Sequence, residues 1–356
     1  MKAVLFDAVG LPLTVGKRPI PEPAEDEVLL RIAACGICGS DLHMTEDPKT
    51  FGLNRHDVLG HEFAGEVIRC GSAVSGLKPG DRVAVAPMRG CGSCDSCRKG
   101  EPAWCAEMRL IGGGYAEFTT VAARQCRILP DDLPIEEGAL AEPVAVALHC
   151  VMRSGLKPGD RVLILGAGPI GLLVAFWARR HGARDVIVAD INTHQEERAA
   201  AVGATGFALS GPGLAEDFQA RTGGEADIVF ECVGKRGLID FACRLVRTHG
   251  TVVGVGLCVG GDQWDPFVAL SKEIRLVFAV FFNMAEFETA LGALGPGHYR
   301  PQALITDRIS FDAVPETFEG LRRRTTQCKV LIAADAALSE WTRRRGYGIR
   351  NADRGH

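Results

Sequence analysis

The sequence predicts an α/β protein with two domains, one rich in β-strands and one built on a doubly wound parallel sheet. Its 356 residues are about twice a usual domain length, and 47% of them are hydrophobic, which is enough for two cores. Short β-branched segments separated by Gly and Pro fill roughly the first 130 residues, whereas strand-like and helical windows alternate from about residue 160. Such alternation is typical of βαβ units.

In the first region, four β-branched segments predict strands of an antiparallel barrel or sandwich, at residues 28–32, 64–68, 82–86 and 115–121. The nonapeptide SGLKPGDRV occurs at 75–83 and again at 154–162. Because nothing around the two copies is alike, we interpret it as a reused turn that leads into a strand, with Pro at its second position and Gly at its third. The second copy opens the parallel-sheet domain.

In the second region, VLIL, VIVAD, DIVFEC and TVVGVG predict strands, and the intervening windows predict helices at 195–202 and 238–246. After Glu286 the pattern becomes a helix at 287–294, the strand-like ALITDRI, another helix and KVLIA. We expect this last segment to return to the first domain. The predicted domains are residues 1–148 together with 287–356, and residues 149–286.

Charge and cysteine content narrow the classes of partner and compartment. A net charge of −4 and a pI near 6.2 argue against nucleic-acid and anionic-membrane partners, which leaves small molecules. The apolar run 162–178 contains Gly and Pro and is interpreted as strand, turn and helix, not as a membrane span. Thirteen cysteines, without a signal-peptide core because Asp7 interrupts the N-terminal apolar run, indicate reduced thiols and metal ligands in a cytoplasmic protein. The polar, basic stretch 339–356 is expected to be a surface tail with no catalytic role.

Four cysteines form the strongest local motif, C-x-x-C-x-x-C-x7-C, made of Cys91, Cys94, Cys97 and Cys105. Four thiolates this close satisfy the tetrahedral preference of zinc and leave no open position, which predicts a structural site. An iron–sulfur cluster is the rival interpretation, but the spacing differs from that of ferredoxins and no second cluster motif is visible.

A glycine motif, GAGPIG, follows an apolar strand and opens a helix, and it comprises Gly166, Gly168, Pro169, Ile170 and Gly171. Its first glycine permits a tight turn, the second lets a pyrophosphate approach the backbone, and the third lets helix and sheet pack closely. Asp190 ends the next predicted strand, where a carboxylate accepts hydrogen bonds from an adenosine ribose. This context predicts a dinucleotide site; a purely structural glycine turn is the alternative.

A third set is scattered along the chain, and it consists of Cys38, His61, Glu62 and Glu142. Each residue alone has an ordinary structural interpretation, since cysteines are usually core residues and glutamates are usually solvated. Cys35 precedes Cys38 by three positions, so the pair suits a metal knuckle, a redox dithiol or simple core packing.

Several motifs in order carry a resemblance: CGICGSD, GHE, the four-cysteine segment, EEGALAEPVAVALH, GAGPIG and KVLI. With them the chain resembles the zinc-dependent medium-chain alcohol dehydrogenases, in the branch that contains sorbitol, butanediol and threonine dehydrogenases. The resemblance extends from residue 1 to 333. It implies a GroES-like β-rich catalytic domain and a Rossmann domain that binds NAD, with two zinc ions per chain, one catalytic and one structural.

The resemblance also implies roles for the scattered residues. Cys38 and His61 correspond to catalytic zinc ligands, and Glu62 and Glu142 to carboxylates that coordinate directly or through water; Cys35 falls where relatives have small or apolar residues. An open zinc site lowers the pKa of a bound alcohol, which then gives hydride to NAD.

The proton would leave through a relay. By position in the family, this relay consists of Ser40, beside the zinc ligand, and His43, which can exchange protons with solvent. A surface histidine at a helix is the alternative interpretation of His43.

Three departures from the family pattern concern the cofactor and the substrate. Gln195 stands where many relatives carry a basic residue against the adenosine, and Arg198 comes three positions later. The segment before Gly112 is shorter than in relatives, which predicts a wider cleft. Phe281 and Phe282 stand where polyol-oxidising relatives have Arg-Tyr.

An apolar residue at 281 predicts a secondary or aromatic alcohol with few hydroxyls as the substrate. A polyol, diol or threonine dehydrogenase is the alternative within the family, and a non-catalytic zinc-binding interaction protein is the alternative from another class.

The run IRLVFAVFF at 274–282 predicts self-association. It is a strongly apolar β-type segment at the end of the parallel sheet, and an exposed edge strand of this kind invites pairing. The resemblance implies that two such strands meet in a homodimer, and that dimers pair into a homotetramer.

Overall fold

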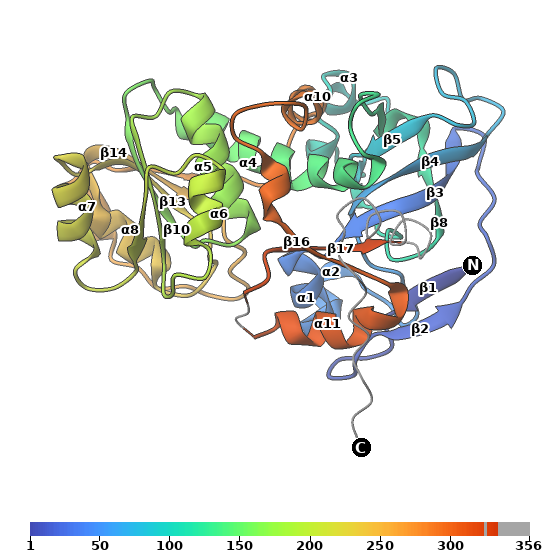
Figure 1. Ribbon diagram of the computed structural model, residues 1–356, viewed down its shortest axis with the longest axis horizontal. Helices are drawn as coiled ribbons and strands as arrows, with labels where there is room; N and C mark the ends of the chain where they lie inside the picture. Colours follow the sequence, from blue (N-terminus) through green and yellow to red (C-terminus); the bar gives the residue numbers. More distant parts are fainter. Residues whose placement is uncertain (324–325, 334–356) are drawn as a thin grey trace.

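The computed structural model describes residues 1–323 and 326–333. Figure 1 shows two lobes side by side, the β-rich lobe around β3, β4 and β8 and the parallel-sheet lobe around β10 and β13. The predicted surface tail at 339–356 lies outside the described residues. Among the described helices, none combines the length and the apolar character needed to cross a membrane.

The β-rich lobe contains a seven-stranded sheet in the order β16-β17-β3-β4-β5-β9, with β8 also paired to β3. Its strands are β3 (Glu27–Gly36), β4 (Glu62–Cys70), β5 (Arg82–Val85), β8 (Phe118–Ala122), β9 (Cys126–Ile128), β16 (Ile305–Ile309) and β17 (Lys329–Ala333). Every pairing is antiparallel except that of β16 with β17. The predicted antiparallel strands are confirmed, but β8 starts later than expected, since the backbone of Tyr115 bonds instead to Val4 and Leu59.

Smaller elements surround this sheet. They are β1 (Lys2–Leu5), β2 (Thr14–Lys17), α1 (Gly39–Glu46), α2 (Pro48–Phe51), β6 (Met88–Arg89), α3 (Asp95–Arg98), β7 (Arg109–Leu110), α11 (Val314–Leu321) and 3-10 turns at Pro102–Trp104, Ala123–Gln125, Ile135–Leu140, Pro301–Leu304 and Phe311–Ala313. The predicted return of the chain to the first sheet is observed, because β17 pairs with β3.

The parallel-sheet lobe contains six strands in the order β12-β11-β10-β13-β14-β15, and all of its pairings are parallel. The strands are β10 (Arg161–Leu165), β11 (Asp185–Asp190), β12 (Gly206–Leu209), β13 (Ala226–Glu231), β14 (Val246–Gly254) and β15 (Arg275–Phe278). The chain starts in the middle at β10, proceeds outward to β12, and then resumes on the other side at β13. This is the doubly wound order, and its switch point between β10 and β13 is where such sheets bind nucleotides.

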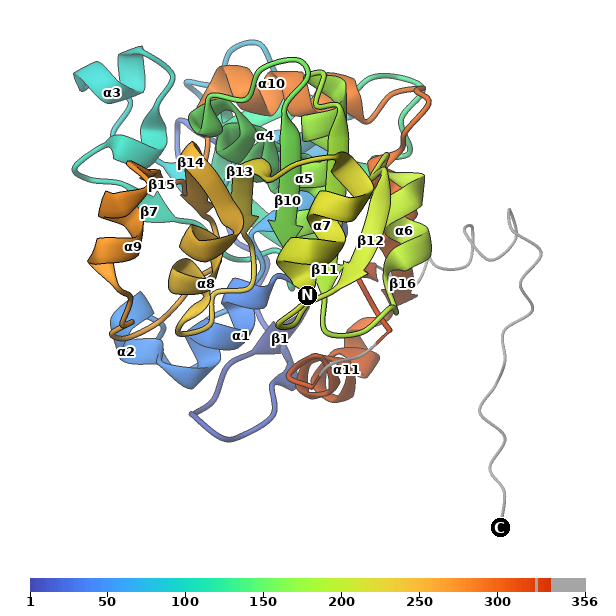
Figure 2. The same cartoon turned by 90° about the vertical axis from the view of Figure 1, so that its left-hand side faces the viewer.

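Helices cover both faces of the parallel sheet, as Figure 2 shows. The helices that pack on its strands are α4 (Ala141–Ser154), α5 (Pro169–Arg180), α6 (Glu196–Ala201), α7 (Leu214–Thr222) and α8 (Leu238–Leu245). Helix α9 (Pro266–Ser271) packs against α8, and α10 (Met284–Ala293) packs against α4. Alternate residues of β10 point to opposite faces, so Val162 and Ile164 join the core with α4 and α5. Leu163 and Leu165 join the core with α7 and α8 on the other face.

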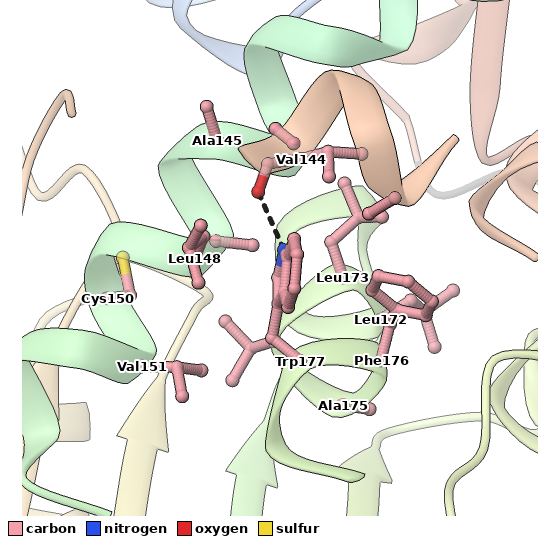
Figure 3. Close-up of a cluster of buried hydrophobic side chains, with 14 of the residues drawn as sticks. Val144, Ala145, Leu148, Cys150, Val151, Leu172, Leu173, Ala175, Phe176 and Trp177 are labelled. Atoms are coloured by element: carbon pink, nitrogen blue, oxygen red, sulfur yellow. Dashed lines mark hydrogen bonds between the residues drawn. The ribbon is translucent and has the colours of Figure 1, made fainter. Parts of the chain in front are cut away.

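Helix α4 connects the two lobes and packs along α5 (Figure 3). Its Leu148 and Val151 face the α5 side chains, and Trp177 of α5 donates its indole N–H to the backbone oxygen of Val144 at 2.9 Å. The expected boundary after residue 148 falls inside this helix. The division into residues 1–148 with 287–356 and residues 149–286 stays a proposal.

The repeated nonapeptide forms the same turn twice, as predicted. Asp81 donates its backbone N–H to Lys78 at 3.1 Å and Asp160 does so to Lys157 at 3.1 Å, while the glycine between them adopts a φ of +94° at Gly80 and +95° at Gly159. Both turns lead directly into a strand, β5 or β10.

The helix predicted at 287–294 begins earlier, at Met284. Asn283 and Glu286 form a capping box, in which each side chain accepts the backbone N–H of the other residue.

Candidate metal and cofactor sites

Two neighbouring strands of the β-rich sheet bring three metal-ligating side chains together. Strand β3 ends at Gly36, directly opposite Glu62 at the start of β4, and Cys38 lies just before α1. One ligand atom from each of Cys38, His61 and Glu62 lies within 4.8 Å of the others. A Cβ at Gly36 would lie 2.0 Å from the Glu62 carboxylate, so a larger residue there would displace this side chain from its present position.

Ser40 lies against the same cluster. Its hydroxyl donates a hydrogen bond to the Cys38 sulfur at 3.2 Å, and its oxygen lies 3.4 Å from Nε2 of His61. The first turn of α1 therefore places a hydroxyl between two of the candidate ligands. His43, one turn further on, is partly exposed and lies 3.6 Å from the carboxylate of Glu46. The relay from Ser40 to His43 stays a prediction.

The buried carboxylate of Asp41 orients His61 from the Nδ1 side of its ring. Nδ1 of His61 lies 3.3 Å from Asp41, whose other oxygen accepts the Tyr115 hydroxyl at 2.6 Å and the backbone N–H of Cys38 at 3.1 Å. Burial alone would raise the pKa of Asp41, but the neighbouring His61 and these hydrogen bonds hold it below its ordinary value. This leaves Nε2 of His61 free to face the cluster, as in other carboxylate–histidine–metal arrangements.

The electrostatics of the cluster favour a cation. Burial alone would lower the pKa of His61, yet the neighbouring Asp41 and Cys38 raise it well above its ordinary value. A position where these neighbours stabilise positive charge also suits a metal ion. Thiolate, imidazole and carboxylate are the ligand types of zinc, and three protein ligands leave a position for a substrate, so the donor set fits a catalytic zinc.

Glu62 has a buried partner that the sequence did not reveal. The Lys329 ammonium donates to both carboxylate oxygens, at 2.7 and 2.6 Å, and lies 3.2 Å from the Ile37 carbonyl oxygen. Burial alone would lower the pKa of Lys329, but Glu62 raises it above its ordinary value. Lys329 opens the wholly buried strand β17, and a lone lysine at the head of KVLIA was the available signal.

Glu142 lies near enough to feel the charges of His61 and Glu62, but it is not one of the three residues whose ligand atoms lie within 4.8 Å of one another. It is buried in the first turn of α4, and burial raises the pKa of its carboxyl to about 7, with the charge of Glu62 acting in the same direction and that of His61 opposing. Its role as a direct zinc ligand stays a prediction. Cys35 is different, since its side chain belongs to the apolar core of the β-rich lobe.

The four cysteines of the C-x-x-C-x-x-C-x7-C motif lie close together, as their spacing predicts. The sulfur atoms of Cys91, Cys94, Cys97 and Cys105 lie within 4.8 Å of one another. Backbone N–H groups point at the sulfurs, from Ser93 and Cys94 to Cys91, and from Glu107 to Cys105. The backbone N–H and the hydroxyl of Ser93, together with the backbone N–H of Cys94, lower the pKa of the Cys91 thiol to about 6. Four sulfurs with N–H donors fit a closed, structural zinc site.

The glycine motif has the shape of a phosphate cradle. Gly166 adopts a φ of +101°, and a Cβ at Gly171 would lie 1.9 Å from the Gly166 carbonyl oxygen, so helix α5 packs closely on the turn. By contrast, a Cβ at Gly168 would meet no heavy atom within 4 Å, which leaves room in front of the helix N-terminus. Pro169 and Ile170 form the first turn of α5. These features fit a dinucleotide pyrophosphate.

Asp190 lies beside this cradle, at the end of β11. One of its carboxylate oxygens accepts the backbone N–H of Ala167 at 2.9 Å, and the other accepts that of Ile191 at 2.7 Å. These bonds join the predicted ribose-binding carboxylate to the glycine turn. Its contact with a ribose stays a prediction.

Phe281 has an unusual backbone, with a φ of +60°. Its side chain is partly buried against the large core that joins the lobes, whereas the next residue, Phe282, is fully buried and stacks on Phe287 with ring centroids 5.4 Å apart. The expected contact of Phe281 with substrate stays a prediction.

Comparison with known proteins agrees with this geometry. The profile of the alcohol dehydrogenase GroES-like domain matches residues 24–131, and that of the zinc-binding dehydrogenases matches residues 169–294. Sorbitol dehydrogenase from Bombyx mori is 32% identical over 331 residues, which cover 89% of this chain and 94% of that protein. L-galactonate-5-dehydrogenase from Escherichia coli (strain K12) is 34% identical over 313 residues, covering 85% and 90%.

Solved structures are similar as well. A zinc-binding dehydrogenase from Sinorhizobium meliloti 1021, bound to NADP, superimposes with a TM-score of 0.83 at 34% identity, covering 93% of this chain and 98% of that one. Galactitol-1-phosphate dehydrogenase from Escherichia coli gives a TM-score of 0.85 at 31% identity, covering 94% and 100%.

A zinc-type ligand set on a β-rich sheet, in one chain with a doubly wound sheet that carries a dinucleotide cradle, is by class a dehydrogenase. The similarity over most of the chain identifies the group more closely. The chain belongs to the zinc-dependent medium-chain dehydrogenase family.

Proposed function

We propose that this enzyme catalyses reversible hydride transfer between an alcohol and NAD at a zinc site formed by Cys38, His61 and a carboxylate. The observation that carries the proposal is the cluster of three ligand atoms within 4.8 Å, buried where β3 and β4 meet. Zinc held there supplies a Lewis acid that lowers the pKa of a substrate hydroxyl, and NAD supplies the hydride acceptor.

The chain itself supplies binding, orientation and a proton path. Asp41 holds His61 in one orientation, and Lys329 donates to both carboxylate oxygens of Glu62 and balances their charge. The Ser40 hydroxyl, between Cys38 and His61, is placed to take the proton of the alcohol.

His43 is the proposed exit of this proton path. Its side chain is 41% exposed, so a proton that reaches it can pass to water. Ser40→Ala should therefore lower kcat more than it changes KM for NAD, because the hydroxyl acts on the alcohol and not on the cofactor.

For the cofactor we propose NAD over NADP. A 2′-phosphate would meet the Asp190 carboxylate at close range, and like charges there reduce affinity. Similar structures include one bound to NADP and, from Escherichia coli CFT073 at 26% identity, one complexed with NADH. The measurement is kcat/KM for the two cofactors, and comparable values would contradict the role given to Asp190.

For the substrate, the leading candidate is a secondary or aromatic alcohol with few hydroxyls. Phe281 offers neither charge nor hydrogen bond, so a polyol hydroxyl left unpaired there would cost about 1–3 kcal/mol, whereas an alkyl or aryl group would gain from burial. The second candidate is a polyol or related sugar alcohol. It is supported by the names of relatives, among them sorbitol dehydrogenase and L-galactonate-5-dehydrogenase.

One experiment tests both candidates. Zinc-loaded enzyme is mixed with NAD and a panel that contains sorbitol, a butanediol, threonine, a simple secondary alcohol and a benzylic alcohol, and NADH is followed by its absorbance. Higher kcat/KM for sorbitol than for the secondary or benzylic alcohol would reverse the order of the two candidates. No turnover with any alcohol by a fully metallated enzyme would favour a non-catalytic zinc-binding protein.

We further propose that the enzyme works in the cytoplasm as a homodimer or homotetramer, without nucleic-acid or membrane partners. None of the thirteen cysteines, all of which lie in the described part of the chain, forms a disulfide, which suits a reducing compartment. The net charge of −4 supports small-molecule substrates over polyanions.

A further inference from the structure

Gln195 reaches from one lobe to the other. It lies five residues after Asp190, at the start of α6, and its side chain is buried, with 8% of the residue exposed. Its carboxamide nitrogen lies 3.2 Å from the carbonyl oxygen of Thr326 and 3.3 Å from that of Gln327, and it donates to both. The side chain is thus directed at the β-rich lobe.

Arg198 holds this carboxamide in place. Its guanidinium donates to the Gln195 side-chain oxygen at 3.0 Å and lies 3.5 Å from the Thr326 carbonyl oxygen. Because its oxygen is engaged by Arg198, the carboxamide of Gln195 must present its nitrogen to the two carbonyls. The two residues form one polar link across the lobes.

The segment that Gln195 binds leads straight to the metal site. Strand β17 begins two residues later with Lys329, the buried partner of Glu62. The intervening Cys328 is buried in the same core as Ala199 of α6, and its backbone N–H donates to the Thr306 hydroxyl at 3.1 Å. A shift of Thr326 and Gln327 would therefore reach Lys329 through a single buried residue, Cys328.

We infer that Gln195 is a positioning residue that aligns the nucleotide cradle with the metal site, through the carbonyls of Thr326 and Gln327 and the Lys329–Glu62 pair. The loop 190–195 carries the ribose carboxylate at one end and the cross-lobe carboxamide at the other. Loss of the link lets the lobes shift relative to each other, and hydride transfer is sensitive to such misplacement. The inference rests on the proposed NAD-linked function.

The test compares Gln195→Leu, which removes the donor, with Gln195→Glu, which keeps the size and the acceptor for Arg198 but also removes the donor. In both variants, amide hydrogen exchange at Cys328 should accelerate about tenfold, because its segment has lost an anchor. kcat should fall about three- to tenfold, the effect of losing one hydrogen bond, while the Kd for NADH changes less than about twofold.

Two further variants serve as controls. Gln219→Leu makes the same change on the exposed surface of α7, and it should leave exchange and kcat unchanged. Gln195→Lys restores a donor toward the two carbonyls but places a second cation beside Arg198, so it should recover only part of the lost kcat.

Three results would overturn the inference. The first is a Gln195→Leu protein that matches Gln219→Leu in both exchange and kcat. The second is an NADH affinity that weakens by the same factor as kcat, since Gln195 would then be a cofactor-binding residue. The third applies if the wild-type enzyme turns over no alcohol: it is amide exchange at Cys328 that is the same in Gln195→Leu and in wild type. Absence of turnover alone contradicts the proposed function but not the link between the lobes, because exchange at Cys328 measures that link without any activity.

Discussion

Tyr115 is buried and belongs to a series of polar contacts that passes through Asp41 to the candidate zinc ligand His61. Its hydroxyl is the donor to buried Asp41 at 2.6 Å. Tyr115→Phe leaves that carboxylate one hydrogen bond short, so the free energy of unfolding should fall by about 1–3 kcal/mol. Zinc retention should weaken about tenfold or more, because such outer partners orient the metal ligands.

Urea unfolding and zinc loss to a chelator check this prediction. Tyr299→Phe is the matched control, since its ring packs against Gly203 and His298 elsewhere in the molecule. Equal zinc retention by the Tyr115 and Tyr299 variants would show that Tyr115 does not act on the metal site.

The two proposed zinc sites should respond differently to loss of one cysteine. Cys38→Ser should abolish turnover and remove one zinc while the fold is largely kept. Cys94→Ser or Cys97→Ser should also remove one zinc but destabilise the fold, because a structural zinc contributes folding free energy. Metal analysis and thermal unfolding separate the cases. A carefully loaded wild-type protein with one zinc or fewer per chain would contradict the scheme.

At this scale, spacing alone grouped only the four cysteines, which the structure also brings together. Cys38, His61 and Glu62 were grouped by the family resemblance, because each of them alone has an ordinary structural interpretation, and Glu142, expected with them, lies outside the group. Asp41, Tyr115 and Lys329 could not be named from the sequence, because their importance depends on strand register and on the meeting of β17 with β3. A buried partner is defined by three-dimensional contact, and its residue type alone does not predict that contact.

At the scale of elements, the repeated turn gives a clear expectation. Gly80 and Gly159 adopt a positive φ, and an added Cβ at either would meet no heavy atom within 4 Å, so any cost of alanine comes from the backbone conformation. Gly80→Ala and Gly159→Ala should each destabilise the protein by about 1 kcal/mol. Gly211→Ala, at an open position with ordinary φ, is the control for urea unfolding. Stability losses equal to that of the control would contradict a shared strained turn.

A carboxylate ties three strands of the parallel sheet and predicts a pH dependence. Asp227 accepts from the guanidinium of Arg161 at 3.1 Å and from that of Arg247 at 2.6 Å, and these partners hold the pKa of its carboxyl below the ordinary value although burial alone would raise it. Its contribution to stability is therefore present above the pKa of the unfolded chain, about 4, and is lost as pH falls through the folded value.

Asp227→Asn should accordingly lower the free energy of unfolding by about 1 kcal/mol near neutral pH, after allowance for solvent screening. The difference from wild type should shrink as the pH falls below about 4. Urea unfolding at several pH values measures it, with Asp217→Asn, whose partner Arg221 lies on the exposed face of α7, as the control. A difference that grows toward acid would reverse the assigned sign.

Element types were predictable where periodicity was strong, and boundaries were not. The strand expected from Tyr115 begins at Phe118, because backbone contacts with Val4 and Leu59 occupy Tyr115. The helix expected from Phe287 begins at Met284, because the Asn283 cap extends it. In both cases the first residue of the element is set by a local hydrogen bond, which the pattern of hydrophobic residues does not predict.

At the scale of the whole molecule, the two patterns of the sequence, β-branched segments in the first region and alternating strand and helix windows in the second, correspond to the two sheets. Alternating strand and helix windows predicted the doubly wound sheet, and the return of the chain after Glu286 was expected from the renewed strand pattern. The link from Gln195 to the segment before β17 was not predictable, since those residues lie 131 positions apart. Sequence patterns describe each lobe well, and the contacts between lobes emerge only in three dimensions.

The edge of the parallel sheet predicts self-association. Strand β15 is an outermost strand; Phe278 at its end is 65% exposed and Val280, two residues further on, is 57% exposed, while Phe267 and Leu270 of α9 are 69% and 72% exposed. Exposed apolar side chains on an open edge favour pairing with a second copy. In a two-fold dimer each substitution appears twice, so Phe278→Asp would bring two carboxylates into one interface and should dissociate it.

Light scattering after size-exclusion chromatography, at micromolar concentration, measures this prediction. Leu209→Asp is the matched control, because Leu209 is 60% exposed at the end of β12, the opposite edge of the same sheet. We expect wild type and Leu209→Asp to remain dimers or tetramers while Phe278→Asp shifts to smaller species. A monomeric wild type would contradict self-association altogether. Dissociation by Leu209→Asp but not by Phe278→Asp would instead assign the interface to β12, which leaves the apolar edge at β15 without the role argued for it.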